Sequence, residues 1–188
     1  MDIQNTEISG LYIILNQTHS DERGKFREWF REETINEHVG SNFHPKQANI
    51  SLSNRGVLRG IHYSVSEIGQ SKLIICAVGS IIDVVVDLRL GSPTFGEMKK
   101  IELDSKSEMT LFVGAGLGHS FLSKEDGTTI IYMQDEIFSP KQEFGINPFD
   151  PSLNIDWPIF DYILSQKDTN APSLQQRIES DELPKFKI

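Results

Sequence analysis

The alternation of apolar and polar residues over 82–89 constrains the fold of this chain most strongly. In the run IIDVVVDLRL, the even positions from 82 to 88 are all apolar, whereas the odd positions from 83 to 89 carry Asp, Val, Asp and Arg. A period of two predicts a β-strand with one buried side. Similar short runs flank it, among them QANISLS, GVLRGIHY, KLIICAV, MKKIELD, MTLFVG and TTIIYMQD. Short strands at regular spacing with Gly-rich turns predict an all-β sandwich or barrel.

Helix is predicted at only two places, 31–39 and 173–181, and Pro172 and Ser173 provide a start signal for the second. No internal repeat, low-complexity tract or linker interrupts the chain, so we expect one domain over 1–188. After the last strands comes the run NPFDPSLNIDWP, which we expect to wrap over the barrel.

Composition limits the partners. The formal net charge is −9, from 27 acidic and 18 basic residues, and such a chain repels nucleic acid. A small anionic substrate would need a local cluster of Arg and Lys. The sequence has no run of about 18 apolar residues, so no membrane span is expected. The N-terminus MDIQNTEISG lacks a signal-peptide pattern, so a cytoplasmic location is expected. The single Cys76 excludes an internal disulfide and is expected to be a small buried hydrophobe.

Two residues of GVLRGIHY are candidates for chemistry. His62 ends a predicted strand and is either a structural histidine or a catalytic one. Arg59 lies three residues earlier, where strict alternation would place it on the opposite face. Gly60 between them could permit a bulge that turns both side chains inward.

Three further candidates lie elsewhere in the chain. Lys72 opens an apolar strand and is either a solvated strand end or an ammonium that stabilises a developing oxyanion. His119 follows a Gly-rich approach to a strand, which either admits a ligand or only makes a turn. Asp168 follows Lys167 in a loop-like stretch and is either functional or a solvated or N-capping acid.

Metal and cofactor chemistry has little support in the sequence. His62 is followed by Tyr63 and Ser64 and has no histidine partner nearby, and His19, His38 and His44 show no ligand spacing. No P-loop, GxGxxG or GxSxG motif is present. We therefore expect neither a metal nor a cofactor.

Ordered motifs along most of the chain match one family. They include DERGKFRE, QANIS, GVLRGIHY, QSKL, VDLRLGSPTFG, GHSF, DPSLNIDWP and LSQKD, in this order. The chain thereby resembles the dTDP-4-dehydrorhamnose 3,5-epimerases, a cupin family. The resemblance implies a cupin-type jelly-roll β-sandwich, a homodimer, no cofactor and a nucleoside-diphosphate 4-keto-6-deoxy sugar as substrate. It leaves open the nucleotide base and whether the sugar is a hexose or a heptose.

The resemblance assigns catalytic roles by matched motif. His62 matches the general base, Asp168 the carboxylate that orients it, and Lys72 the group that stabilises the enolate oxygen at C4. His119 matches a second inward histidine near the sugar. These residue types suit the chemistry, because a neutral histidine titrates near working pH and a proton beside a ketone leaves its charge on oxygen.

The resemblance also implies substrate-binding residues. Arg59 and Arg23 match a diphosphate clamp, for which the planar fork of arginine is well suited. Phe26 and Glu28 match positions that reach the nucleotide of the neighbouring subunit. Two polar residues match the lining of the pocket, Gln47 and Asn49.

One departure from the family concerns the acid. The double epimerases carry a Tyr that protonates the opposite face of the sugar, and in YMQDEIFSP this position falls on Ile137. Tyr63 and Tyr132 are conceivable stand-ins. We therefore predict inversion of one stereocentre, C3. The alternatives are a full 3,5-epimerase with a relocated acid, and a 3,4-ketoisomerase or non-catalytic sugar-nucleotide-binding member.

Overall fold

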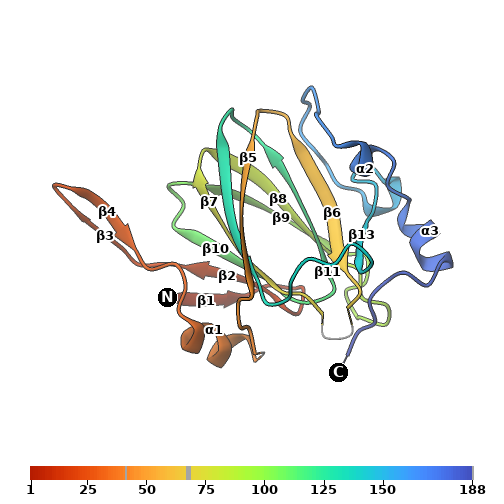
Figure 1. Ribbon diagram of the computed structural model, residues 1–188, viewed down its shortest axis with the longest axis horizontal. Coiled ribbons are helices and arrows are strands. Elements are labelled where there is room, and N and C mark those ends of the chain that lie inside the picture. Colours follow the sequence, from red (N-terminus) through yellow and green to blue (C-terminus); the bar gives the residue numbers. More distant parts are fainter. Residues whose placement is uncertain (41, 67–68, 188) are drawn as a thin grey trace.

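A computed structural model of the chain describes residues 1–40, 42–66 and 69–187. Two antiparallel sheets face each other (Figure 1). The six-stranded sheet has the order β1 (Asp2–Asn5), β2 (Leu11–Leu15), β10 (Met109–Val113), β7 (Lys72–Val78), β12 (Thr128–Gln134), β5 (Gln47–Ser53). The five-stranded sheet has the order β13 (Glu143–Gly145), β6 (Leu58–Ser64), β11 (Leu117–Ser123), β8 (Ser80–Asp87), β9 (Met98–Asp104). The predicted all-β jelly-roll sandwich is confirmed.

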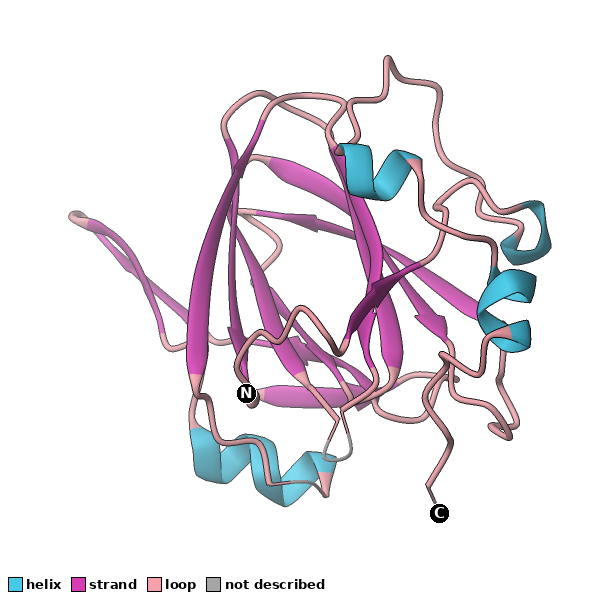
Figure 2. Cartoon of the chain, turned by 45° about the vertical axis from the view of Figure 1, so that its right-hand side comes forward, coloured by secondary structure: helices cyan, strands magenta, loops and turns pink. Residues whose placement is uncertain are grey.

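The helices are short and lie at the periphery, with α1 apart from α2 and α3 (Figure 2). Helix α1 (Glu32–Val39) is confirmed and ends at Gly40, whose φ of 63° suits a glycine. Helix α3 (Leu174–Glu179) is confirmed with a capping box at Ser173, although it ends before the predicted 181. A 3-10 turn, η1, spans Pro151–Leu153.

Helix α2 (Gln166–Thr169) was not predicted, because its four residues are too few for a periodic pattern. It forms in the stretch that the sequence suggests is a loop. Ser165 caps it, since its hydroxyl accepts a hydrogen bond from the backbone N–H of Asp168. The cap fixes the backbone from which Asp168 projects.

Strand β8 is buried on both faces, so the prediction of one buried side is wrong. Val85 belongs to the core between the sheets, whereas Val84 and Val86 pack under the C-terminal part of the chain. That part, drawn in blue, lies along the outer side of β6 and β13 (Figure 1) and contributes Leu153 and Trp157 to the outer core. The predicted wrapping of NPFDPSLNIDWP is thus confirmed, and it explains why the outer face of β8 is buried.

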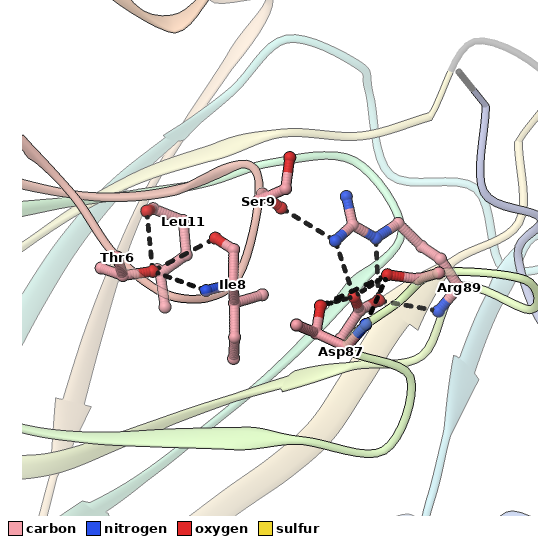
Figure 3. Close-up of polar contacts among 8 residues, drawn as sticks. Thr6, Ile8, Ser9, Leu11, Asp87 and Arg89 are labelled. Atoms are coloured by element: carbon pink, nitrogen blue, oxygen red, sulfur yellow. Dashed lines mark hydrogen bonds and ion pairs between the residues drawn. The ribbon is translucent and has the colours of Figure 1, made fainter.

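Asp87 is fully buried on β8 because other residues neutralise and hydrogen-bond its carboxylate (Figure 3). Arg89 donates to it from Nε at 2.8 Å and from Nη2 at 2.7 Å, and the hydroxyls of Ser92 and Thr94 also donate. Burial raises the pKa of Asp87, but the hydrogen bonds from these donors lower the pKa by more, so the net shift is downward. Arg89 also donates to the carbonyl of Ser9, which ties the N-terminal loop to the sandwich.

Gly60 interrupts β6 as predicted. The pairing of β6 with β11 shifts register between His119 and Phe121, and Gly60 has a φ of 106°. A Cβ at Gly60 would lie 2.5 Å from the carbonyl oxygen of His119, so only glycine fits. The irregularity allows Arg59 and His62 to face the same side of the sheet.

A hairpin of β3 (Thr18–Asp21) and β4 (Gly24–Arg27) projects away from the sandwich (Figure 1). Phe26 on it is 70% exposed. At the free edge of the six-stranded sheet, β5 exposes Ile50 and Leu52. None of the helices in the described ranges is sufficiently long and apolar to span a membrane.

Candidate active site

A cavity of about 450 Å³ opens between the two sheets. One wall is the five-stranded sheet, which contributes His62 from β6 and His119 from β11. The other wall is the six-stranded sheet, which contributes Lys72 from β7 and Tyr132 from β12. A base candidate and an ammonium therefore enter one cavity from opposite sides.

His62 is paired with Asp168 as predicted. Nε2 of His62 lies 2.6 Å from Oδ1 of Asp168, which is a buried residue of α2. Burial raises the pKa of Asp168, but the hydrogen bond and charge of His62, with the Ser165 and Gly60 contacts, lower it more, so the net shift is downward. Because Asp168 engages Nε2, the other ring nitrogen of His62, Nδ1, is the atom left to accept a proton.

His119 forms a second pair of the same type. Its Nε2 lies 2.7 Å from Oδ2 of Asp83, a fully buried residue of β8. Sequence reasoning placed Asp83 on a strand face but did not assign it a partner. The other carboxylate oxygen of Asp83, Oδ1, has no hydrogen-bond partner in the described part of the chain.

Lys72 is buried at the start of β7, so it is not the solvated strand end that the sequence left open. Burial lowers the pKa of its ammonium, while the negative charges of Glu143 and Asp83 oppose the shift. A buried ammonium is a strong electrostatic partner for an oxyanion, because the surrounding protein screens its charge less than bulk water would.

The two tyrosines considered as stand-ins and the position matched to the family's acid lie in different parts of the structure. Tyr132 lines the cavity, and burial raises the pKa of its phenol, which favours the protonated form. Tyr63 is fully buried elsewhere and donates its hydroxyl to the carbonyl of Glu182. Ile137 lies in the loop after β12 with 61% of its surface exposed. Of the two stand-ins, Tyr132 is the one that reaches the cavity.

The predicted polar lining is present in part. Arg59 and Gln47 line the cavity. Arg59 is held by a hydrogen bond from its Nε to the hydroxyl of Ser53. Asn49 lies beside Gln47, from which it accepts a hydrogen bond, and donates to Gln134 on β12. The bond from Asn49 to Gln134 ties β5 to β12 at the wall of the cavity.

Three predicted residues lie outside the lining of this chain's own cavity: Arg23, Phe26 and Glu28. They belong to the projecting hairpin and the segment after it, where Arg23 pairs with Asp21 and Glu28 with Arg31. These two ion pairs are local, since they join residues two and three positions apart, so neither of them brings the segment to the cavity.

Sequence reasoning missed four polar residues of the lining: Ser51, Gln134, Glu143 and Lys167. The alternation of QANISLS could have found Ser51, because it shares a face with Gln47 and Asn49. Lys167 stood inside a matched motif but received no role. Glu143 follows a turn, where no periodicity signals its direction. Within the described ranges, no three His, Cys, Asp or Glu side chains are grouped as metal ligands.

Comparison with known proteins identifies the family. The sequence profile of dTDP-4-dehydrorhamnose 3,5-epimerase matches residues 5–176. The chain belongs to this family. A dTDP-4-dehydro-6-deoxyglucose 3-epimerase of Streptomyces bikiniensis is 43% identical over 157 residues, 83% of this chain and 80% of that protein. A dTDP-4-dehydrorhamnose 3,5-epimerase of Mycolicibacterium smegmatis is 38% identical over 98% of this chain and 91% of its own.

The solved structures agree with this assignment. A double mutant of ChmJ, a 3'-monoepimerase from Streptomyces bikiniensis in complex with dTDP, superposes with a TM-score of 0.93 at 38% identity. The match covers 97% of this chain and 92% of ChmJ. Members of this family are sugar-nucleotide epimerases, which are isomerases, and the cupin-type fold predicted from the sequence is confirmed.

Proposed function

We propose that this enzyme inverts C3 of a nucleoside-diphosphate 4-keto-6-deoxy sugar without a cofactor. The observation that carries the proposal is the His62–Asp168 pair, which faces Lys72 across one cavity. A binding module has no need of a base, its orienting acid and a buried ammonium. Proton removal beside a ketone is accelerated by all three.

The reaction requires a proton to leave one face of C3 and another to arrive at the opposite face. His62 takes the proton from C3, and the electron pair moves to the C4 oxygen, where Lys72 stabilises the enolate. Tyr132 then donates its phenolic proton to C3 from the six-stranded sheet, opposite His62. Exchange with solvent then removes the proton that His62 gained and returns one to Tyr132. General-base catalysis contributes about 10²–10⁴ in rate, and an oxyanion donor about 3–4 kcal/mol.

The anionic end of the substrate is bound by the cationic part of the lining. Arg59 and Lys167 both line the cavity and suit the diphosphate. We propose that the enzyme is a homodimer in which Arg23, Phe26 and Glu28 complete the neighbouring site. The projecting hairpin and its 70% exposed Phe26 support this arrangement, as does the apolar free edge of β5.

Inversion at C3 alone is supported by the relatives and by the loop after β12. The 43% identical relative is a 3-epimerase, and ChmJ is a 3'-monoepimerase. In the ChmJ double mutant, the replaced histidine and tyrosine are separated by the same number of residues as His62 and Tyr132. Ile137, at the position matched to the acid of the double epimerases, has no proton to donate.

A full 3,5-epimerase is the second candidate, because Tyr132 lies in the cavity and could serve as a relocated acid for both carbons. The 38% identical relative is a 3,5-epimerase. Both candidates use the same base, so the positions that exchange with solvent distinguish them.

Incubation with dTDP-4-keto-6-deoxyglucose in D₂O tests the proposal. We expect one deuterium, at C3, in an inverted product. Deuterium at C3 and C5 with two inverted centres would support the second candidate, and no exchange at either carbon would refute both. Ile137→Tyr is the complementary variant: gain of C5 inversion would support the account of the lost acid.

A further inference from the structure

Side-chain amides at the six-stranded wall of the cavity are joined in a chain of hydrogen bonds. Nε2 of Gln47 donates to Oδ1 of Asn49 at 2.9 Å, and Nδ2 of Asn49 donates to Oε1 of Gln134 at 3.0 Å. Nε2 of Gln134 donates in turn to Oε1 of Gln70 at 2.7 Å. Gln70 lies two residues before β7, so the chain crosses from β5 over β12 to the strand that begins with Lys72.

Both ends of this chain attach to the loop that follows β12. The backbone N–H of Phe138 donates to Oε1 of Gln47 at 2.8 Å, and Nε2 of Gln70 donates to the carbonyl of Glu136 at 3.4 Å. The chain thus closes into a ring through the backbone of 136–138, and we call it the amide ring. Phe138 lines the cavity, so the amide ring helps to determine where this part of the wall lies.

The five hydrogen bonds of the amide ring run in one direction, since each side chain accepts through its oxygen and donates through its nitrogen. No member can turn its amide over, because oxygen would then face oxygen and nitrogen would face nitrogen at its two neighbours. Hydrogen bonds arranged in this way also strengthen one another. Each amide donates one N–H to the ring, so Gln47 and Gln134, which line the cavity, keep a second N–H in a fixed orientation.

Gln70 differs from Gln47 and Gln134 because it is buried outside the lining of the cavity. Its place suits a residue that acts on the substrate through its neighbours. Without the Gln70 side chain, Nε2 of the buried Gln134 would lose its acceptor. An unpaired buried N–H is unfavourable, so Gln134 would turn towards another acceptor and release Asn49. Gln47 and the loop would then lose the support of the ring.

We propose that Gln70 is a positioning residue for substrate binding, which closes the amide ring and thereby holds Gln47 and the loop 136–138 in the arrangement that fits the substrate. The inference rests on the proposed function, because it requires a sugar nucleotide in this cavity. The ring contains neither His62 nor Lys72, so its loss should weaken binding without removing either reacting group.

Calorimetric binding of dTDP-6-deoxyglucose, which lacks the ketone and is not turned over, tests the proposal. Gln70→Met keeps the length of the side chain but removes both of its hydrogen bonds in the ring. Gln175→Met is the matched control, on an exposed residue of α3 that bonds to Glu179. We expect Gln70→Met to bind about 10-fold to 100-fold more weakly than the wild type, and the control to bind equally. With dTDP-4-keto-6-deoxyglucose, KM should rise by a similar factor while kcat falls less than about 3-fold.

A double-mutant cycle with Gln47→Met distinguishes the ring from a local effect at Gln70. Gln47 bonds to Asn49 and Phe138 at the other end of the chain. If the ring acts as one unit, the double variant should bind within about 3-fold of the weaker single variant. Losses that multiply would overturn the inference, as would binding by Gln70→Met at the wild-type affinity, or a fall in kcat with KM unchanged.

Urea unfolding establishes that each variant is folded. If Gln70→Met is not, Gln70→Asn takes its place, because its amide is one carbon too short to reach both partners. The same weakening is expected of it, and wild-type affinity in Gln70→Asn would equally overturn the inference. If the wild type does not bind the sugar nucleotide, the proposed function fails instead.

Discussion

Two His–Asp pairs share the cavity, and their differences define which histidine can act. His62 and His119 are register partners on adjacent strands, and each places Nε2 close to an aspartate oxygen, at 2.6 Å and 2.7 Å. The aspartates differ in origin: Asp168 comes from the short helix α2, whereas Asp83 lies on β8, next to β11. The histidines differ in access, since the side chain of His62 is 35% exposed and that of His119 only 12%.

The comparison shows that pair geometry alone does not assign a base. Both histidines are oriented by a carboxylate, but His62 has the room to meet a substrate carbon. His119 is nearly enclosed, with a fully buried partner, so its pair is better suited to holding β8 and β11 in place beside the substrate. We therefore expect the His62–Asp168 pair to act in catalysis and the His119–Asp83 pair to act in stability.

Replacing each aspartate by alanine should give crossed results. Asp168→Ala should lower kcat about 10²- to 10⁴-fold, because His62 loses its orientation and the support of its charged form. It should cost little stability, since water reaches His62. Asp83→Ala should instead destabilise the fold by about 1–3 kcal/mol, because it leaves Nε2 of the enclosed His119 without an acceptor. Steady-state kinetics and urea unfolding measure the two effects.

Equal losses of activity in Asp83→Ala and Asp168→Ala would contradict this distinction between the two pairs. If Asp83→Ala loses as much activity as Asp168→Ala while remaining folded, both pairs take part in the chemistry. His119 would then need a catalytic role of its own.

Lys72→Met tests the ammonium that both pairs face. It should lower kcat about 10²- to 10³-fold, by loss of enolate stabilisation. Burial lowers the pKa of Lys72, so wild-type activity should fall with rising pH at a pH below the ordinary lysine value of 10.5. Between the lowered pKa and 10.5 the unfolded chain binds more protons, so wild-type stability should rise with pH there. In Lys72→Met that rise should vanish, and its persistence would assign it to another group.

Tyr132→Phe has the smallest expected effect on proton removal. The base and the ammonium stay in place, so deuterium should still enter C3. Inversion should fall by about 10- to 100-fold relative to exchange, because the acid opposite His62 is lost. Mass spectrometry gives the exchange, and NMR of the product gives the configuration. Inversion at the wild-type rate would show that another donor serves that face.

The sequence predicted the sandwich because the alternation of each strand is a local property. It predicted the places of His62, Arg59 and Lys72, since a strand and the Gly60 irregularity determine their direction. It did not predict that β8 is buried on both faces, because its second cover comes from residues about 70 and more positions further along the chain.

The rest of the site depends on contacts that have no local pattern. Asp168 meets His62 only because α2 forms and docks on β6, and four residues are too few for a helical period. The sequence did not show which of Tyr63 and Tyr132 reaches the cavity, because the matched motif places the family's acid at Ile137, which lies in an exposed loop. Glu143 reaches the cavity through the pairing of β13 with β6, which joins residues far apart in the chain.

The most direct measurement is the rate at which solvent deuterium enters C3 in His62→Asn and His119→Asn, compared with the wild type. In His62→Asn the exchange rate should fall about 10²- to 10⁴-fold, because His62 removes the proton. In His119→Asn it should fall less than about 10-fold. Exchange at the wild-type rate in His62→Asn, or an equal loss in both variants, would contradict the account.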